Sequence, residues 1–291
     1  MKKVVVDIED MEQMSPIFRG KWGHKLANLV IHVFDIEKVN WVYGRSCQFT
    51  GAAFANSLLN DLGVQYLIGN AERLRQLPEG AFITVSNHPY GGLDGVMLID
   101  LMAGIRSDYK LMVNQLLSYV KTMDDHFISV KPKVGKKSTD PVAGVNGIRE
   151  TLTNLHEGHP VGFFPAGAVS MFSFRRLRVS DREWQESIIK LIQRANVPVL
   201  PIRFFDQNSP FFYFLGTIDW RIRLIRMPYE LFNKDRHPHH IGIGSLLPAD
   251  EIASFKDARS LGDFLKQTVY TMPRPTTFIP RNALTLPNHT L

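Results

Sequence analysis

Residues 84–95 read TVSNHPYGGLDG, and the local pattern of this stretch decides the fold expected of the chain. The β-type run Ala81–Ser86 ends at Asn87, and a turn that contains Gly91 and Gly92 follows. The arrangement places His88 at the end of a strand. A carboxylate, Asp94, lies six residues later, across a loop whose glycines allow it to fold back.

His88 and Asp94 form a candidate catalytic pair. A carboxylate bonded to one imidazole nitrogen fixes the tautomer and raises the basicity of the other nitrogen. That second nitrogen can then take a proton from an attacking hydroxyl. The loop at residues 87–95 includes no serine or cysteine nucleophile, so the pair would activate a hydroxyl of the substrate. The same residues also fit a loop histidine beside an aspartate that caps a helix.

Composition predicts a globular protein with a basic surface. The chain has 291 residues, of which 44% are hydrophobic and 21% charged, enough for a large α/β core with one appended subdomain. The net charge of +6 suits anionic lipid headgroups or an acidic carrier protein. Nucleic acid is not an expected partner, because only the net charge favours it. A single cysteine, Cys47, excludes an intrachain disulfide and a multi-cysteine metal site.

The sequence contains no targeting or membrane-spanning signal. Residues 1–14 read MKKVVVDIEDMEQM and lack the apolar core of a secretory peptide. No run of about 18 apolar residues is present. We therefore expect a cytoplasmic protein that associates peripherally with the inner face of the cell membrane.

Residues 1–62 are expected to form a helical subdomain. Apolar side chains recur at helical spacing between Leu26 and Phe34, and Trp22 lies near Lys21 and Lys25. Aromatic residues beside lysines are typical of a helix at a membrane interface. Packing of the apolar face against the core is the other interpretation.

Residues 63–272 alternate predicted strands and helices. The strands are Val64–Ile68, Ala81–Ser86, Tyr109–Val113, Phe127–Val130, Val161–Phe164, Val197–Phe204 and His240–Ile243. Helices are expected from Asp140 to Gly158, from Asp181 to Ala195 and from Ala249 to Tyr270. This rhythm predicts an α/β fold with a mixed, mostly parallel sheet flanked by helices. Residues 273–291 are expected to form an irregular tail.

Two further junctions follow predicted strands. After Val161–Phe164 comes a turn of small residues, Pro165-Ala166-Gly167, whose backbone N–H groups could face a ligand or an oxyanion. Ser170, Arg175 and Arg176 follow, although a plain turn beside a solvated basic face fits equally. The segment Val197–Arg203 carries two prolines, which indicate an edge strand or a bend. Lys131, Lys133, Lys136 and Lys137 form another basic cluster, which could dock an acidic carrier or a phosphate, or could be a solvated face.

The motifs NHPYGGLDG, GFFPAGAVS and VPVLPI occur in this order. Together they resemble the glycerophosphate and lysophospholipid acyltransferase superfamily, and are most similar to a hemolysin-like bacterial branch that includes ornithine- and glycine-lipid O-acyltransferases. Residues 205–213, which read FDQNSPFFY, also resemble that branch. The similarity covers roughly residues 60 to 245.

The resemblance implies transfer of a fatty acyl group from a thioester to the hydroxyl of a lysolipid. His88 would be the general base and Asp94 would orient it. The acceptor and oxyanion pocket would involve Asn87, Gly91, Gly92, Phe164, Pro165, Ala166, Gly167 and Ser170. Arg175 or Arg176 would meet an anionic headgroup. The donor would be acyl-carrier protein or acyl-coenzyme A, with no metal or bound cofactor.

Two departures from the superfamily pattern affect the expected acceptor. Five residues separate His88 from Asp94, where the usual motif has four, and the Gly91-Gly92 pair can absorb the extra residue. Ala166 stands where the wider superfamily carries a glutamate that helps hold glycerol phosphate. An amino-acid-derived acceptor, lyso-ornithine or lyso-glycine lipid, is therefore favoured. Lysophosphatidic acid as acceptor, a hydrolase, and a non-catalytic peripheral lipid-binding protein are the alternatives.

Overall fold

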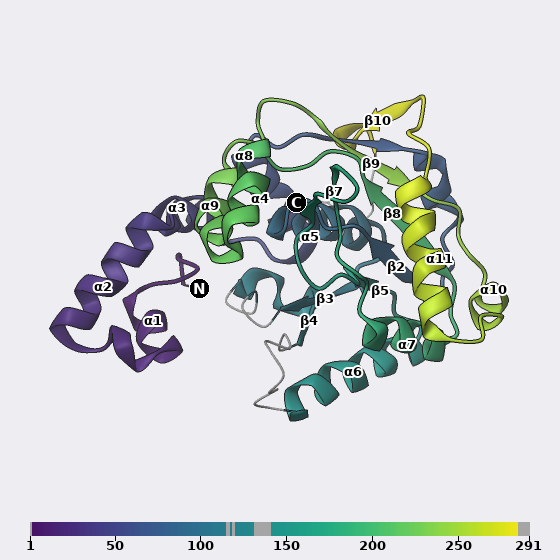
Figure 1. Ribbon diagram of the computed structural model, residues 1–291, viewed down its shortest axis with the longest axis horizontal. Coiled ribbons are helices and arrows are strands. Elements are labelled where there is room, and N and C mark those ends of the chain that lie inside the picture. Colours follow the sequence, from purple (N-terminus) through teal and green to yellow (C-terminus); the bar gives the residue numbers. More distant parts are fainter. Residues whose placement is uncertain (1, 115–116, 118–119, 131–140, 285–291) are drawn as a thin grey trace.

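The computed structural model describes residues 2–114, 117, 120–130 and 141–284 (Figure 1). The lysine cluster at 131–137 and the expected helix start at Asp140 lie outside these residues. Within the described part, no helix combines the length and the apolar character needed to cross a bilayer.

An eight-stranded sheet forms the centre of the molecule, in the order β10-β1-β9-β8-β2-β5-β3-β4 (Figure 1). Neighbouring strands run parallel except in the pairs β1–β10 and β8–β9. The strands are β1 (Tyr66–Gly69), β2 (Ile83–Ser86), β3 (Lys110–Asn114), β4 (Phe127–Val130), β5 (Val161–Phe163), β8 (Val199–Phe204), β9 (His239–Ile243) and β10 (Phe278–Pro280). The predicted mixed, mostly parallel sheet flanked by helices is confirmed, and all seven predicted strands are present.

Two hydrophobic layers cover the two faces of the sheet. Alternation along β2 sends Ile83 and Val85 to one layer, and β8 divides its residues in the same way. One layer packs under α6 (Pro141–His156), α7 (Glu186–Ala195) and α11 (Ala258–Thr271). The other packs under α4 (Gly51–Asp61), α5 (Gly92–Leu98) and the π-helical turn Ile99–Ala103. Both faces are buried, as the apolar runs of a parallel sheet require.

The amino-terminal helices divide into two groups. α1 (Ile8–Met14) and α2 (Gly20–Val33) extend away from the sheet (Figure 1). α3 (Ile36–Ser46) and α4 contribute Tyr43 and Phe54 to the core, and these rings meet edge to face at 5.5 Å. The expected helical character of this region is confirmed. On α2, Leu29 and Val33 are exposed, so that part of its apolar face does not pack on the core.

Four local expectations differ from the structure. The helix expected from Asp181 begins at Glu186, because Asp181 is tied to other loops through its side chain. The helix expected over 249–270 is interrupted: α10 (Ala249–Ala253) ends, and Asp257 then caps α11 through a bond from the Ser260 N–H. Residues 278–280 are not irregular, because they pair with β1 as β10. The proline-containing strand β8 is not an edge strand, since it lies between β9 and β2.

A separate hairpin and a helix pair lie beside the carboxyl end of β2. The hairpin consists of β6 (Met171–Ser173) and β7 (Arg178–Ser180), and the helices are α8 (Pro210–Ile218) and α9 (Trp220–Leu231). α8 packs against both α9 and β6. These elements surround the loop that carries His88.

Candidate active site

His88 lies just beyond the carboxyl end of β2, a central strand flanked by β5 and β8 in parallel register. In open α/β sheets, ligands bind in the crevice beyond these strand ends. The loop turns through Gly91, whose φ of 86° favours glycine, and α5 begins at Gly92. A side chain at Gly91 would also press against Val169 and Met227, each within 3.3 Å of the added carbon.

The structure brings His88 and Asp94 together. His88 Nδ1 lies 2.8 Å from Asp94 Oδ2, and the exposed fraction of the side chain is 17% for the histidine and 0% for the aspartate. Asp94 Oδ2 also accepts hydrogen bonds from the N–H groups of Tyr90 and Gly91, at 2.9 and 3.1 Å. Asp94 therefore caps α5 and contacts the imidazole at the same time.

Burial controls the electrostatics of the pair. The pKa of Asp94 is raised from its ordinary value by desolvation, and this effect exceeds the opposing influence of His88 and of the two N–H donors. The second oxygen, Oδ1, is buried without a hydrogen-bond partner. The fold therefore keeps a desolvated carboxylate beside Nδ1 of His88. With the proton on Nδ1, Nε2 is the basic nitrogen.

Phe164 holds the imidazole from the other side. It follows β5 directly, and its ring stacks on the His88 ring with centroids 4.1 Å apart and an interplanar angle of 24°. A stacked ring restricts rotation of the imidazole, so Asp94 and Phe164 together define the direction in which Nε2 points.

The Pro89 carbonyl in the loop that carries His88 is held by one residue of α8 and one residue just before α8. Pro89 O accepts hydrogen bonds from Tyr213 Oη at 2.8 Å and from Asn208 Nδ2 at 3.2 Å. Asn87 makes a reciprocal pair with the Phe204 backbone: its Nδ2 donates to Phe204 O at 2.9 Å and its Oδ1 accepts from Phe204 N at 2.8 Å. Asn87 thus joins the ends of β2 and β8, and both ends of its amide are already engaged.

Asp181 connects the His88 loop to the loop after β5. Its Oδ1 accepts from the His88 N–H at 3.3 Å and from Ser170 Oγ at 2.5 Å, while Oδ2 accepts from Trp184 Nε1 at 3.0 Å. Ser170 donates its N–H to His88 O at 2.8 Å and is 1% exposed. Ser170, predicted to bind substrate, therefore lies beside the loop that carries His88, with its hydroxyl turned to Asp181.

The turn Pro165–Gly167 is largely engaged in internal contacts. The Gly167 N–H donates to Phe164 O at 2.9 Å, and Arg182 Nε donates to Ala166 O at 2.7 Å. Ala166 is fully buried within the core layer that includes Phe163. A side chain added at Gly167, where φ is 60°, would meet Gln185 at 1.7 Å. Because Ala166 is fully buried in that layer, its side chain points into the core.

Arg175 and Arg176, which were also predicted to bind substrate, lie at the tip of the β6–β7 hairpin. Both are exposed, in the four-residue connection between β6 and β7 that begins with Phe174 and ends with Leu177. The structure thus brings the predicted loop residues together and leaves the two arginines at the surface.

Two histidines of residues 237–240, which read HPHH, make contacts outside the His88–Asp94 pair. His239 Nε2 bonds to Lys234 O at 3.0 Å, so it carries the proton, and Nδ1 accepts from Tyr90 Oη at 2.9 Å. Burial lowers the pKa of His239, in agreement with this neutral form. His240 Nδ1 lies 2.8 Å from Asp206 Oδ2. In the described ranges, no three His, Cys, Asp or Glu side chains gather as metal ligands.

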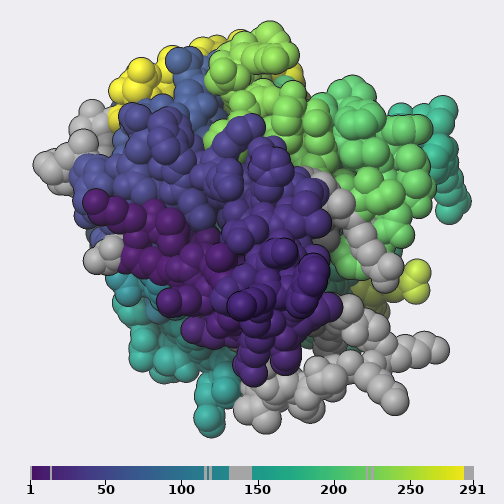
Figure 2. Space-filling model, turned by 90° about the vertical axis from the view of Figure 1, so that its left-hand side faces the viewer, coloured from purple at the N-terminus to yellow at the C-terminus, as the bar shows by residue number. Residues whose placement is uncertain are grey.

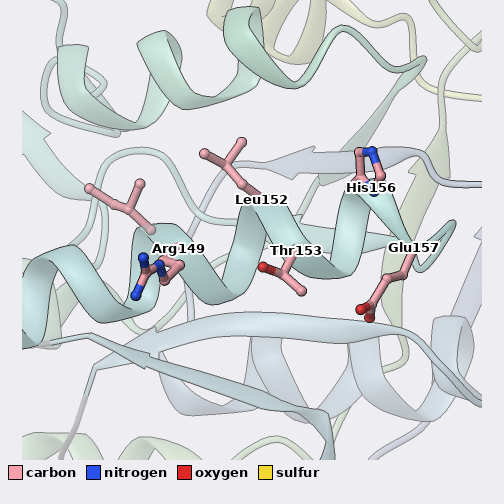
Figure 3. Close-up of a pocket in the computed structure, with 6 residues that line it drawn as sticks. Arg149, Leu152, Thr153, His156 and Glu157 are labelled. Carbon is pink, nitrogen blue, oxygen red and sulfur yellow. The ribbon is translucent and has the colours of Figure 1, made fainter.

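One hollow lies away from the His88–Asp94 pair, and another borders the loop that carries His88. One is on the outer side of α6, where Figure 3 shows Leu152 and His156 on one side of the helix and Thr153 and Glu157 on the other. These polar groups diverge and form no acid–base constellation. The other is a small cavity behind the loop, lined by Asn87, Pro89, Ser170, Arg178, Val179, Arg203, Phe204, Phe205, Asp206, Gln207 and Tyr270.

Sequence reasoning missed three residues of the site: Asp181, Asn208 and Tyr213. Each reaches the loop from a distant part of the chain, so that no local spacing reveals its partner. The signal that existed was the segment at 205–213, which contains Asn208 and Tyr213 and was similar to the same protein family. Asp181 carried no such signal.

Comparison with known proteins identifies the family of the chain. A family model described as "Acyltransferase" matches residues 11–276. A lyso-glycine lipid O-acyltransferase of Bacteroides thetaiotaomicron is 27% identical over 245 residues, which cover 81% of this chain and 85% of the relative. Another from Phocaeicola vulgatus is 24% identical over 277 residues, covering 90% and 94%. The crystal structure of PlsC, the 1-acyl-sn-glycerophosphate acyltransferase of Thermotoga maritima, aligns over 83% of this chain and 84% of that one, with 14% identity and a TM-score of 0.48.

Proposed function

The chain belongs to this acyltransferase family, and we propose that it moves a fatty acyl group from a thioester donor to the hydroxyl of a lysolipid. The observation that carries the proposal is the His88–Asp94 pair at the end of β2, with Nδ1 and Oδ2 2.8 Å apart and the imidazole stacked on Phe164. The loop contains no nucleophile of its own, so direct attack by an activated substrate hydroxyl is the chemistry that fits.

His88 acts as the general base in the proposed reaction. Nε2 takes the proton of the acceptor hydroxyl as its oxygen attacks the carbonyl carbon of the thioester. The tetrahedral intermediate then collapses, the carbon–sulfur bond breaks, and the imidazolium returns the proton to the leaving thiolate. Asp94 stabilises the imidazolium between these steps, as a buried carboxylate beside Nδ1 does in other catalytic pairs. The products are an ester and a free thiol, and no metal or cofactor is required.

We infer an amino-acid-derived lysolipid as the acceptor. The two curated relatives are named lyso-glycine lipid O-acyltransferases, and they cover most of this chain. Ala166 supports the same choice, since its side chain is fully buried and offers no charge to a glycerol phosphate. We further propose acyl-carrier protein or acyl-coenzyme A as the donor. The reaction would take place at the inner face of the cell membrane, to which the protein binds peripherally.

Mass-spectrometric detection of acylated product tests the proposal. Purified protein would be supplied with acyl-carrier protein or acyl-coenzyme A, and with lyso-glycine lipid, lyso-ornithine lipid or lysophosphatidic acid in separate reactions. We expect product with an amino-acid lysolipid and none with the His88→Ala variant. Product with lysophosphatidic acid alone would keep the mechanism and overturn the acceptor. Thiol release without an acceptor would identify a hydrolase instead, and no turnover of any kind would favour a lipid-binding protein.

A further inference from the structure

Helix α8 has two contrasting faces. On the inner face, Phe212 and Tyr213 are 0% and 3% exposed, and Tyr213 Oη holds the Pro89 carbonyl of the catalytic loop at 2.8 Å. On the outer face, Phe211, Phe214 and Ile218 are 51%, 57% and 60% exposed. The same helix therefore positions the loop of His88 and presents a row of large apolar side chains to the outside.

The apolar outer face continues onto the neighbouring elements. Phe174 and Leu177 at the hairpin tip are 71% and 78% exposed, and Trp220 at the start of α9 is 54% exposed. α8 packs against both β6 and α9, so the three elements form one surface. We call this surface the aromatic platform and define it by Phe174, Leu177, Phe211, Phe214, Ile218 and Trp220. Scattered apolar side chains are common on protein surfaces, whereas a contiguous cluster of this kind marks an interaction site.

The platform is rimmed by positive charge. Residues 169–180 contain three exposed arginines, Arg175, Arg176 and Arg178, and no acidic residue. Arg226 lies with its guanidinium carbon 3.4 Å from the centroid of the Tyr229 ring, beside the platform. A surface of exposed aromatic side chains edged by arginine is complementary to the interface of a bilayer that contains anionic lipids.

We propose that the aromatic platform is the surface by which this protein docks on an anionic lipid bilayer. The Phe, Leu, Ile and Trp side chains enter the interfacial region, and the arginines at the rim contact headgroup phosphates. This inference rests on the proposed function in one respect: a lysolipid would reach the end of β2 from the bilayer along α8, without passing through water.

Figure 2 looks onto the end of the molecule that carries α1 and α2 in purple and α8 and α9 in green. Trp22 of α2, 82% exposed, gives this end a second interfacial side chain.

An acidic protein partner is a less suitable occupant of the platform. Recognition of a carrier protein draws on exposed charge, which the arginines supply, but it leaves the large apolar area of Phe174, Leu177 and α8 unexplained. Bilayer insertion uses the apolar and the basic components together. The bilayer is therefore the occupant that accounts for every exposed side chain of the platform.

Vesicle flotation tests the platform directly. The full-length protein would be mixed with vesicles of phosphatidylcholine, with or without phosphatidylglycerol, and compared with the double variants Phe174→Ser/Leu177→Ser and Phe211→Ser/Phe214→Ser. We expect the wild type to float with the anionic vesicles, and each double variant to bind them about tenfold more weakly or worse. Ile148→Ser on α6 is the matched control, because Ile148 is also exposed, at 39%, but lies outside the platform. Circular dichroism melts would check that all variants fold.

Three results would overturn the proposal. Wild-type protein that does not float, or double variants that float as well as Ile148→Ser, would exclude the platform as a bilayer contact. Loss of binding to acyl-carrier protein in the double variants, without any change in flotation, would assign the surface to that partner. A shift from dimer to monomer in the variants, again with unchanged flotation, would assign it to a second copy of this chain.

An activity measurement separates this proposal from the proposed function. The double variant Phe174→Ser/Leu177→Ser should lose turnover with acceptor embedded in vesicles and keep it with short-chain acceptor dissolved as monomers. If no acceptor is ever acylated, the proposed function fails, and flotation still decides the docking surface. If flotation is unaffected while acyl transfer proceeds, the docking surface fails and the enzyme assignment stands.

Discussion

The loop around His88 and the tip of the β6–β7 hairpin illustrate two ways of carrying charged and polar groups. In the loop, Asp94 is fully buried, and the side chains of Asp181 and Tyr213 hold the backbone on either side of the histidine. At the tip, Arg175 and Arg176 are exposed between two exposed apolar residues. Buried polar groups with fixed partners set the direction of a side chain, whereas exposed ones leave it free. The loop is therefore built for chemistry, and the tip is suited to recognition.

Replacement of His88 by alanine gives the largest expected loss. Removing the general base should lower the rate constant of acyl transfer by about 10²- to 10⁴-fold. The measurement is the initial rate of thiol release with a saturating acceptor. The melting temperature should change little by comparison, because the imidazole contributes one stacking contact and one contact with Asp94. Retention of more than about a tenth of the wild-type rate would remove His88 from the reaction.

Replacement of Asp94 by asparagine separates catalysis from stability. The amide keeps the size of the carboxylate and can still accept from the Tyr90 and Gly91 N–H groups, but it no longer stabilises an imidazolium. We expect the rate to fall by on the order of tenfold to a hundredfold. The free energy of unfolding at pH 7 should stay equal or rise, because burial of the Asp94 charge has a cost that asparagine avoids.

The difference in stability between the wild type and Asp94→Asn should depend on pH, and the raised pKa of Asp94 sets the direction. The pKa of Asp94 is raised above its ordinary value of 3.8, so between these two pKa values the native state binds more protons than the unfolded state. The free energy of unfolding of the wild type should therefore fall as pH rises through this window, relative to the asparagine variant. Paired urea titrations from acid to neutral pH provide the measurement. A wild type that gains stability over the variant with rising pH would contradict the raised pKa.

The sequence predicted the sheet and the contact between His88 and Asp94 because both depend on local patterns. Apolar runs between turn residues located all seven predicted strands, and the ordered motifs indicated the family that the family model confirms. His88 and Asp94 lie on one short loop, so their spacing alone brought them to one place. Helix boundaries were less accurate, because the residues Asp181 and Asp257 are fixed by contacts of their side chains.

The contacts that hold the loop could not be predicted. Asp181 lies 93 residues beyond His88, and Asn208 lies 119 residues beyond Pro89. Such contacts depend on how β7 and α8 pack over the strand ends, and no periodicity encodes that placement. The direction of Ala166 was unpredictable for the same reason: a small residue after a strand can face a ligand or the core, and only the packed structure shows it within the core.

Replacement of Asp181 by alanine should disturb the buried loop from a distance. Ser170 Oγ, Trp184 Nε1 and the His88 N–H would each lose an acceptor, so the free energy of unfolding should fall by about 1–3 kcal/mol. Ser170→Ala is the matched variant, because it removes only one of these bonds and should cost about 1 kcal/mol. Chemical denaturation measures both. Equal stabilities of the two variants would show that Asp181 does not organise the loop.

Alanine substitution of Arg175 and Arg176 should have the smallest effect, and it sharpens the contrast with the loop. Both side chains are exposed, so neither the melting temperature nor kcat should change measurably. If these arginines meet the anionic headgroup of a monomeric acceptor, KM should rise by about two- to fivefold in the double variant, the range expected of exposed ion pairs. Added salt should raise the KM of the wild type toward that of the variant, because screening weakens exposed charges. A fall in kcat at unchanged KM would instead place the tip among the groups that act on the reacting atoms.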